Sequence, residues 1–267
     1  MSKNIDLAFD GPIAVVTLNR PDKYNGLTLD MLDGLIDAAR RIRRNRDIRA
    51  VVLHGAGEAF CAGLDFPSAT KQPWRVARAF MRNPFKTRNT FQEAVWCWRE
   101  LPVPVVAAVH GHCYGGGLQI ALAADFRDCA PDARLSIMES KWGMVPDLTG
   151  TLTLRELLPL DIAKDLAMHA TVLSGEEAKD LNLVTRVADD PLAAAMERAR
   201  RLAERSPDAM AGTKRLFQAN WHAKARRAFR NERAIQLRIL VSDNYRRALR
   251  ANFAGKKAEF GPRSKWL

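Results

Sequence analysis

Residues 104–117 read PVVAAVHGHCYGGG, and this stretch decides the fold class. The apolar, β-branched run at 103–111 is typical of a buried strand. The sequence GGGLQIALAADF at 115–126 then predicts a buried helix that the chain enters through glycines. The first N–H groups of such a helix have no acceptor within it and carry partial positive charge. An anionic oxygen can bind there.

Upstream of this stretch, strand and helix patterns alternate. PIAVVTLN at 12–19 and RAVVLH at 49–54 are short β-branched runs that predict buried strands. Between them, residues 27–45 have apolar side chains at helical spacing, and a second helix is expected around 90–100. RLSIM at 134–138 predicts a fourth strand. Strand, helix and strand in succession indicate a parallel sheet, so we predict an α/β fold.

The C-terminal half is predicted to be helical. Ser174 and Glu177 form a capping-box pattern, and Ser206 followed by Pro207 marks another helix start. Residues 223–252 predict one long or broken amphipathic helix.

Two further features set the domain organisation. The basic stretch 71–90 contains prolines and predicts a loop or a mobile helix between core elements. We expect an α/β core at 1–205 and a helical C-terminal extension at 206–267, a size ordinary for one domain with an appendage.

Composition narrows the class of protein. The chain has 267 residues, of which 47% are hydrophobic and 27% charged, as in globular proteins. No apolar run reaches the roughly 18–20 residues that span a bilayer. The N-terminal residues lack a signal-peptide pattern, and the four cysteines form no CxxC pair. We therefore expect a cytoplasmic protein with free thiols.

Positive charge is concentrated towards the C-terminus. The formal net charge is +12, and residues 221–267 carry 13 Lys and Arg against 3 Asp and Glu, a balance of 13 − 3 = +10. Such a balance suits a phosphorylated cofactor, nucleic acid or an anionic surface. The alternative is a solvated helix face.

A second glycine-containing motif follows an earlier strand. Residues 59–65 read AFCAGLD, directly after the strand at 49–54 and a Gly55-Ala56-Gly57 turn. Small residues there let the backbone approach a ligand and expose its N–H groups. Neither motif is a dinucleotide fingerprint or a P-loop, because neither has the GxGxxG or GK[ST] spacing.

Taken together, three motifs identify a family. VTLNRPDKYN at 16–25, AFxAGxD at 59–65 and PVVAAVxGxxxGGG at 104–117 occur in an order and spacing that resemble the crotonase (enoyl-CoA hydratase/isomerase) superfamily. The resemblance covers nearly the whole chain. It implies a spiral, ClpP-like fold of repeated ββα units, assembled as trimers or pairs of trimers, and an isomerase or lyase role in fatty acid metabolism.

The resemblance also implies a coenzyme A thioester site. The backbone N–H groups of Leu64 and Gly116 would form an oxyanion hole for the thioester oxygen. One such donor is typically worth about 3–4 kcal/mol in an enolate-forming reaction. Coenzyme A would enter as part of the substrate, with no permanently bound cofactor and no metal. By resemblance, its contacts would be Lys23, Ala62, Leu64, Asp65, Lys256 and Lys257.

The acidic residues determine which reaction the site performs. Family hydratases use two glutamates, and the positions here are Gln119, which cannot titrate, and Glu139. Asp147 lies eight residues beyond Glu139, a spacing similar to the acidic pair of dienoyl-CoA isomerases. A carboxylate pair can move a proton between two carbons through an enolate, so we favour isomerisation. The isomerase pattern usually has a third carboxylate, where Gln119 stands.

The same residues also fit four alternatives to isomerisation. Glu139 alone could support hydration, and Asp147 falls where 4-chlorobenzoyl-CoA dehalogenases carry a nucleophilic aspartate, although that pattern has Trp at position 139. Alternatively the carboxylates are structural, with Asp147 as a helix N-cap and Glu139 in an ion pair. The positive charge of residues 221–267 also allows the hypothesis of a non-enzymatic protein with the same fold that binds nucleic acid.

Aromatic and histidine side chains complete the candidate site. We expect Trp74, Phe80, Met81 and Phe85 to lie near the acyl group, and we place Gln119 and Trp142 in the same substrate pocket. His110 and His112 lack a third metal ligand, so packed or hydrogen-bonded histidines are favoured.

Overall fold

The computed structural model describes residues 4–81 and 87–266. Its centre is a six-stranded sheet in the order β1-β2-β3-β4-β6-β8. The strands are β1 (Ile5–Asp10), β2 (Ile13–Leu18), β3 (Ala50–Gly55), β4 (Val105–Val109), β6 (Phe126–Cys129) and β8 (Arg186–Val187). Only the β1–β2 pair is antiparallel among these described strands; the other neighbours are parallel, as strand–helix–strand succession predicts.

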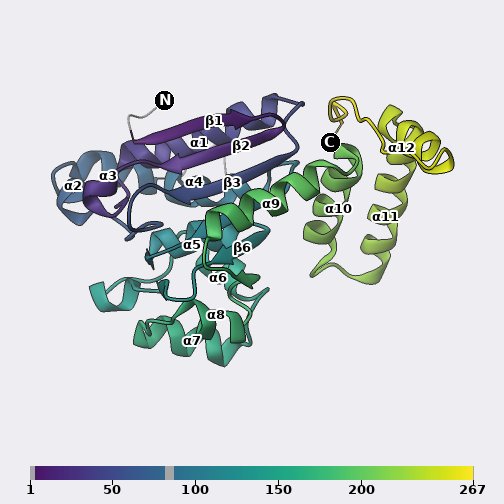
Figure 1. The fold of residues 1–267 in the computed structure, drawn as a ribbon. Coiled ribbons are helices and arrows are strands. Elements are labelled where there is room, and N and C mark those ends of the chain that lie inside the picture. The colour runs from purple at the N-terminus through teal and green to yellow at the C-terminus, as the bar shows by residue number, and fades with distance from the viewer. Residues whose placement is uncertain (1–3, 82–86, 267) are drawn as a thin grey trace.

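Helices cover both faces of this sheet (Figure 1). On one face, α1 (Leu29–Arg44) and α4 (Thr90–Arg99) pack on the inward side chains of the strands, such as Val51 and Leu53. The other side chains of the same strands, such as Val52, meet α9 (Pro191–Ala203). The β3 and β4 runs are apolar on both faces because both faces are buried.

A second, smaller layer is built from segments that follow strands of the main sheet in the chain. Strands β5 (His112–Tyr114) and β7 (Arg134–Ser136) pair in parallel, and bridges at Leu27–Leu64 and Cys61–Cys113 extend this layer. Each turn of the chain thus contributes one strand to each layer, followed by a helix, as in β4-β5-α5 (α5, Gly116–Ala123). This is the repeated ββα arrangement that the sequence resemblance implies.

The other helices of the described chain lie between these elements or after α9. They are η1 (Pro21–Lys23), α2 (Phe66–Thr70), α3 (Pro73–Phe80), η2 (Glu139–Trp142), α6 (Gly150–Leu154), α7 (Leu160–His169), α8 (Gly175–Asp180), α10 (Pro207–Asn220), α11 (Ala225–Leu240) and α12 (Asp243–Phe253). In the described part of the chain, no helix combines the length and apolar content needed to cross a bilayer.

The predicted helix starts are confirmed, and the differences have local causes. Ser174 and Ser206 cap α8 and α10 as predicted. The pattern at 223–252 forms two helices, because Ser242 accepts a hydrogen bond from the Tyr245 N–H and starts α12. Within the stretch predicted as a loop or mobile helix, α3 begins with Pro73 at its first position. The sequence did not predict β1, because it is a largely exposed edge strand without an apolar run.

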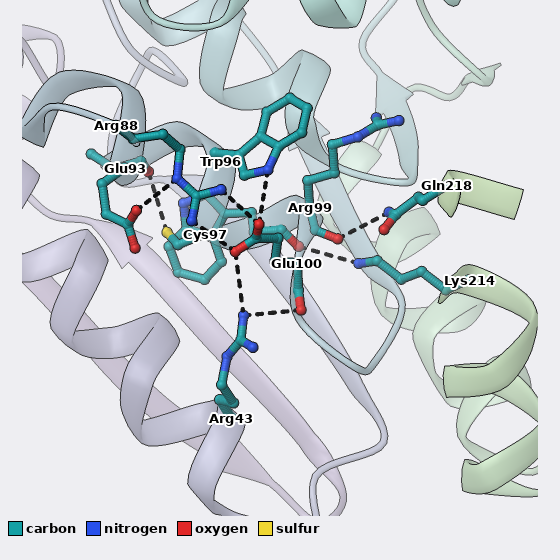
Figure 2. A network of polar contacts seen from close by, with 11 residues as sticks. Arg43, Arg88, Glu93, Trp96, Cys97, Arg99, Glu100, Lys214 and Gln218 are labelled. Atoms are coloured by element: carbon teal, nitrogen blue, oxygen red, sulfur yellow. Dashed lines mark hydrogen bonds and ion pairs between the residues drawn. The ribbon is translucent and has the colours of Figure 1, made fainter. Parts of the chain in front are cut away.

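The C-terminal helices are joined to the core through α10 (Figure 2). The buried Lys214 Nζ donates to the carbonyl oxygens of Trp98 (3.2 Å) and Val103 (3.0 Å) and pairs with Asp125 (2.7 Å). Gln218 donates to the Arg99 carbonyl oxygen (2.9 Å). α11 and α12 pack on α10 and project from the sheet in Figure 1. The division of the chain at residue 206 stays a prediction.

Candidate active site

A cavity of about 120 Å³ opens where β3 and β4 lead into the second layer. Its backbone floor is formed by Ala62–Leu64 and Gly115–Gly116, and the carboxylates of Glu139 and Asp147 reach it from the following segments. Its apolar wall includes Leu27, Phe66, Phe80, Phe91, Trp142 and Leu148. The cavity therefore combines polar groups at one side with an aromatic and aliphatic lining.

The Leu64 N–H is left free by the way its segment pairs with neighbouring strands. Cys61 N–H donates to the His112 carbonyl oxygen, and Tyr114 N–H donates back to the Cys61 carbonyl oxygen, both at 2.9 Å. Leu27 N–H donates to Gly63, and Asp65 N–H donates to Leu27. The Leu64 N–H points away from this ladder and has no acceptor within the described residues.

The Gly116 N–H is the first donor of α5. Gly115 before it adopts a φ of 50° without a side-chain cap, and the Gly116 N–H has no acceptor in the described chain. A Cβ at Gly117 would lie 2.4 Å from the Cys61 carbonyl oxygen, so only glycine lets α5 approach the Cys61–Leu64 segment. A Cβ at Gly63 would lie 3.7 Å from Gly116 N. The two free donors thus lie on adjoining segments of one cavity.

Glu139 is the buried carboxylate of the site. It begins η2 and is 5% exposed. Its Oε1 accepts a hydrogen bond from Gln119 Nε2 at 2.6 Å, whereas its buried Oε2 has no hydrogen-bond partner. Burial raises the pKa of Glu139; hydrogen bonds from its own backbone N–H and from Gln119 oppose the rise, and the negative charge of Asp147 adds to it.

Asp147 is half-buried on the same cavity. Burial raises its pKa, against a hydrogen bond from its own backbone N–H. The alternative in which Asp147 caps a helix is wrong, because the N-cap of α6 is Thr149. The other structural alternative places Glu139 in an ion pair, and no ion pair of Glu139 is found among the described residues. Two carboxyl groups with raised pKa values therefore face an apolar cavity.

Some predicted residues lie away from this cavity. Trp74 is 86% exposed on α3 and does not line it. Gln119 is buried behind Glu139 instead of facing the substrate space. Lys257 pairs with Glu204 at 2.6 Å, and with Lys256 it follows α12, at the opposite end of the molecule from α2 and α3 in Figure 1. Phe85 lies outside the described residues.

The predicted coenzyme A contacts near the cavity have mixed roles. Lys23 is exposed at the end of η1, and Ala62 is an exposed part of the cavity floor. Asp65 caps α2 by accepting from Ser68 N–H at 3.0 Å and pairs with Arg20 at 2.5 Å. Although burial raises the pKa of Asp65, these two partners hold it below its ordinary value. Its carboxylate is thus committed to the local fold.

The sequence did not point to two aromatic residues of the cavity wall. Phe66 packs against Trp142 with ring centroids 4.7 Å apart, and Phe91 packs against Phe80 at 4.6 Å. The only local signal for Phe66 is its position directly after the AFCAGLD motif. Phe91 belongs to an amphipathic helix, where its spacing predicts only burial.

The histidines are hydrogen-bonded, as expected. His110 Nε2 lies 3.0 Å from the Gly57 carbonyl oxygen, and His112 Nδ1 lies 3.1 Å from the Tyr114 hydroxyl. Within the residues described by the structure, no group of three or more His, Cys, Asp or Glu side chains could hold a metal ion.

Comparison with known proteins agrees with this geometry. The family described as "Enoyl-CoA hydratase/isomerase" matches residues 8–262. The chain is 30% identical over 250 residues to the enoyl-CoA hydratase EchA19 of Mycobacterium tuberculosis, covering 93% of this chain and 92% of that protein. It is 29% identical over 262 residues to the peroxisomal Delta(3,5)-Delta(2,4)-dienoyl-CoA isomerase of Arabidopsis thaliana, covering 94% and 93%.

A solved structure extends the comparison to three dimensions. An enoyl-CoA hydratase from Polaromonas sp. JS666 superimposes with a TM-score of 0.87 at 28% identity, over 96% of this chain and 99% of that one. The ββα spiral, the two free backbone donors and these matches lead to one conclusion. The chain belongs to the enoyl-CoA hydratase/isomerase family and is an acyl-CoA enzyme with the crotonase fold.

Proposed function

We propose that this enzyme shifts a carbon–carbon double bond within an acyl-CoA thioester by proton transfer. The observation that carries the proposal is the pair Glu139 and Asp147. Both are carboxyl groups with raised pKa values on one apolar cavity, while the position of the second hydratase glutamate holds Gln119. An amide at that position can neither take nor supply the proton that hydration requires.

The reaction begins with proton removal next to the thioester or at the conjugated γ carbon. The bare Oε2 of Glu139 takes this proton, and negative charge moves to the thioester oxygen. The N–H groups of Leu64 and Gly116 donate to that oxygen and stabilise the enolate. They are effective because they are fixed before the charge develops and have no competing acceptor in the described chain.

Asp147 completes the double-bond shift by returning a proton to a different carbon. One carboxyl group must therefore enter the cycle ionised and the other protonated. A raised pKa on both groups supports these two roles. It brings each pKa closer to neutral pH, where each carboxyl group then holds a proton part of the time. Asp147 is the less buried of the two, so it can exchange its proton with solvent between turnovers.

We further propose that coenzyme A binds as part of the substrate, with its thioester end at the cavity floor. Ala62 is an exposed residue of that floor and Lys23 is exposed at the end of η1, so both are accessible for adenine and phosphate contacts. Lys256 and Lys257 would need a neighbouring copy to contribute to phosphate binding, because they follow α12, which lies at the opposite end of the molecule from α2 and α3 in Figure 1. A homotrimer or a dimer of trimers is consistent with the exposed Phe229, Leu237 and Phe253 on α11 and α12.

Hydration is the second candidate function. The free Oε2 of Glu139 could hold a water molecule, and one relative carries the name enoyl-CoA hydratase. Incubation of 2-enoyl-, 3-enoyl- and 3,5-dienoyl-CoA thioesters in water labelled with deuterium and ¹⁸O distinguishes the two reactions. Deuterium on carbon without ¹⁸O in the product supports isomerisation, whereas ¹⁸O bound as hydroxyl contradicts it and supports hydration.

A further inference from the structure

Gln119 uses both ends of its side-chain amide inside the protein. It lies in the first turns of α5 and is 1% exposed. Its Oε1 accepts a hydrogen bond from the Gly150 N–H at 2.9 Å, and its Nε2 donates to Glu139 Oε1 at 2.6 Å. A backbone N–H can only donate, so the amide oxygen must face Gly150 and the NH₂ group must face Glu139. The orientation of the amide is thereby fixed by its partners.

Two glycines make room for this bridge. A Cβ at Gly150 would lie 2.6 Å from Gln119 Oε1, and a Cβ at Gly115 would lie 3.3 Å from Glu139 Oε1. Thr149, just before Gly150, adopts a left-handed φ of 68°, which is unfavourable for a β-branched residue. The segment that positions the Gly150 N–H for Gln119 is therefore locally strained.

We propose that Gln119 is a positioning residue that anchors Glu139 through Oε1, leaves Oε2 as the proton-transferring oxygen, and ties Glu139 to the segment that carries Asp147. This inference rests on the proposed function in one respect, namely that Glu139 is the group that exchanges protons with the substrate. The bridge joins η2 to the N-terminus of α6, and Asp147 lies three residues before Gly150. Gln119 therefore acts on both carboxyl groups without contacting the substrate.

The amide also has an electrostatic consequence. A donor at Oε1 favours the ionised form of Glu139 and opposes the effect of burial. A carboxyl group at position 119 would face Glu139 Oε1 at a similar distance, and the two groups would have to share a proton. With glutamine there, Glu139 and Asp147 are the two carboxyl groups among the described residues that line the cavity, and position 119 adds no third.

Infrared titration of the substrate-free protein tests the proposal directly. The carboxyl stretch that disappears in Glu139→Gln reports the protonation of Glu139. In Gln119→Met, which keeps the volume and loses the donor, this band should titrate about one pH unit higher, a roughly tenfold tighter binding of the proton. In the nearly isosteric Gln119→Glu, the pair should titrate in two steps, with the upper step above the wild-type value.

Thr153→Val is the matched control. Thr153 is buried on α6 and donates to the Gly150 carbonyl oxygen at 3.1 Å, yet it has no hydrogen bond to Glu139. Its loss should leave the Glu139 band in place. An unchanged titration in folded Gln119→Met, or a single unshifted step in Gln119→Glu, would overturn the proposal.

The pH profile of turnover separates this inference from the proposed function. For the double-bond shift, the acid limb of the pH profile of kcat/KM should move to higher pH in Gln119→Met, by the same number of pH units as the infrared band. We expect kcat to be reduced and KM to change little. If the infrared band moves but no thioester is isomerised by the wild type, the proposed function fails while the anchoring of Glu139 stands. If turnover is normal and neither profile moves, the positioning role is refuted.

Discussion

At the scale of single residues, the site is defined by which polar atoms have partners. Glu139 Oε2 and the N–H groups of Leu64 and Gly116 lack acceptors or donors in the described chain, although buried polar groups are normally satisfied. Asp65, by contrast, is fully engaged with Arg20 and Ser68. Unsatisfied groups gathered at one cavity indicate that a ligand completes them.

The carboxyl pair gives the first prediction. Glu139→Gln and Asp147→Asn should each lower kcat for double-bond migration by about 10²–10⁴-fold, because each removes a proton carrier while keeping shape. Asp165→Asn is the control, since Asp165 is an exposed carboxylate that pairs only with His169 among described side chains. Steady-state assays of all three variants on one thioester check this. Full activity of Asp147→Asn would assign proton return to another group.

The raised pKa of Glu139 gives a second prediction, on stability. A carboxyl group whose pKa is raised by folding binds its proton more tightly in the folded protein than in the unfolded chain. The free-energy cost of burying the ionised carboxylate is fully present above the pKa that the group has in the folded protein. It disappears as the pH falls towards the ordinary carboxyl range. Glu139→Gln should therefore melt at a higher temperature than wild type at about pH 8, with the difference shrinking towards about pH 4. A difference that grows on acidification would contradict the assigned direction.

At the scale of secondary-structure elements, the close contact between α5 and the Cys61–Leu64 segment aligns the two backbone donors. The contact depends on Gly117, where a Cβ would lie 2.4 Å from one backbone oxygen and 2.9 Å from Cys61 Sγ. The first neighbour is backbone, and the second belongs to a fully buried side chain whose Sγ donates to the Asn25 carbonyl oxygen at 3.1 Å. The absence of a side chain at position 117 therefore controls the geometry of the proposed oxyanion hole.

Gly117→Ala should consequently destabilise the protein by about 1–3 kcal/mol and reduce turnover, because α5 must move away from Leu64. Gly11→Ala is the comparison: Gly11, between β1 and β2, has a φ of 55° in open space, so the change costs only about 1 kcal/mol of backbone strain and leaves activity intact. Urea unfolding and kcat measure the two effects. Equal losses in the two variants would show that packing at α5 is not limiting.

At the scale of the whole molecule, a few buried polar contacts join the C-terminal helices to the core. Lys214 makes several of these contacts; burial lowers its pKa while Asp125 opposes the change. Figure 2 shows it reaching from α10 to the end of α4, beside the cluster around Glu100. This attachment fixes where α11 and α12 project.

Lys214→Met should therefore cost about 3–5 kcal/mol, because it leaves Asp125 and two carbonyl oxygens without their cation. The neighbouring Arg215 forms no ion pair with the described residues, so Arg215→Met should change stability by less than about 0.5 kcal/mol. Guanidinium unfolding of both variants provides the comparison. A small loss in Lys214→Met would mean that α10 is held mainly by apolar contacts.

The sequence by itself determined the features that depend on neighbouring residues. Helix starts at Ser174 and Ser206, the parallel α/β pattern and the two glycine motifs follow from spacings of a few residues, and the motifs sufficed to assign the family. The carboxyl pair was also visible as a spacing, although its use stays a prediction.

Only the tertiary structure decided how distant segments share the site. Gln119 contacts Glu139 and Gly150, 20 and 31 residues away, and its role depends on an amide orientation that no local pattern encodes. Phe66 and Phe91 line the cavity and Trp74 does not, because the packing of the helices determines which of their side chains face inward. Local propensity fixes elements, whereas burial and pairing between elements fix the chemistry.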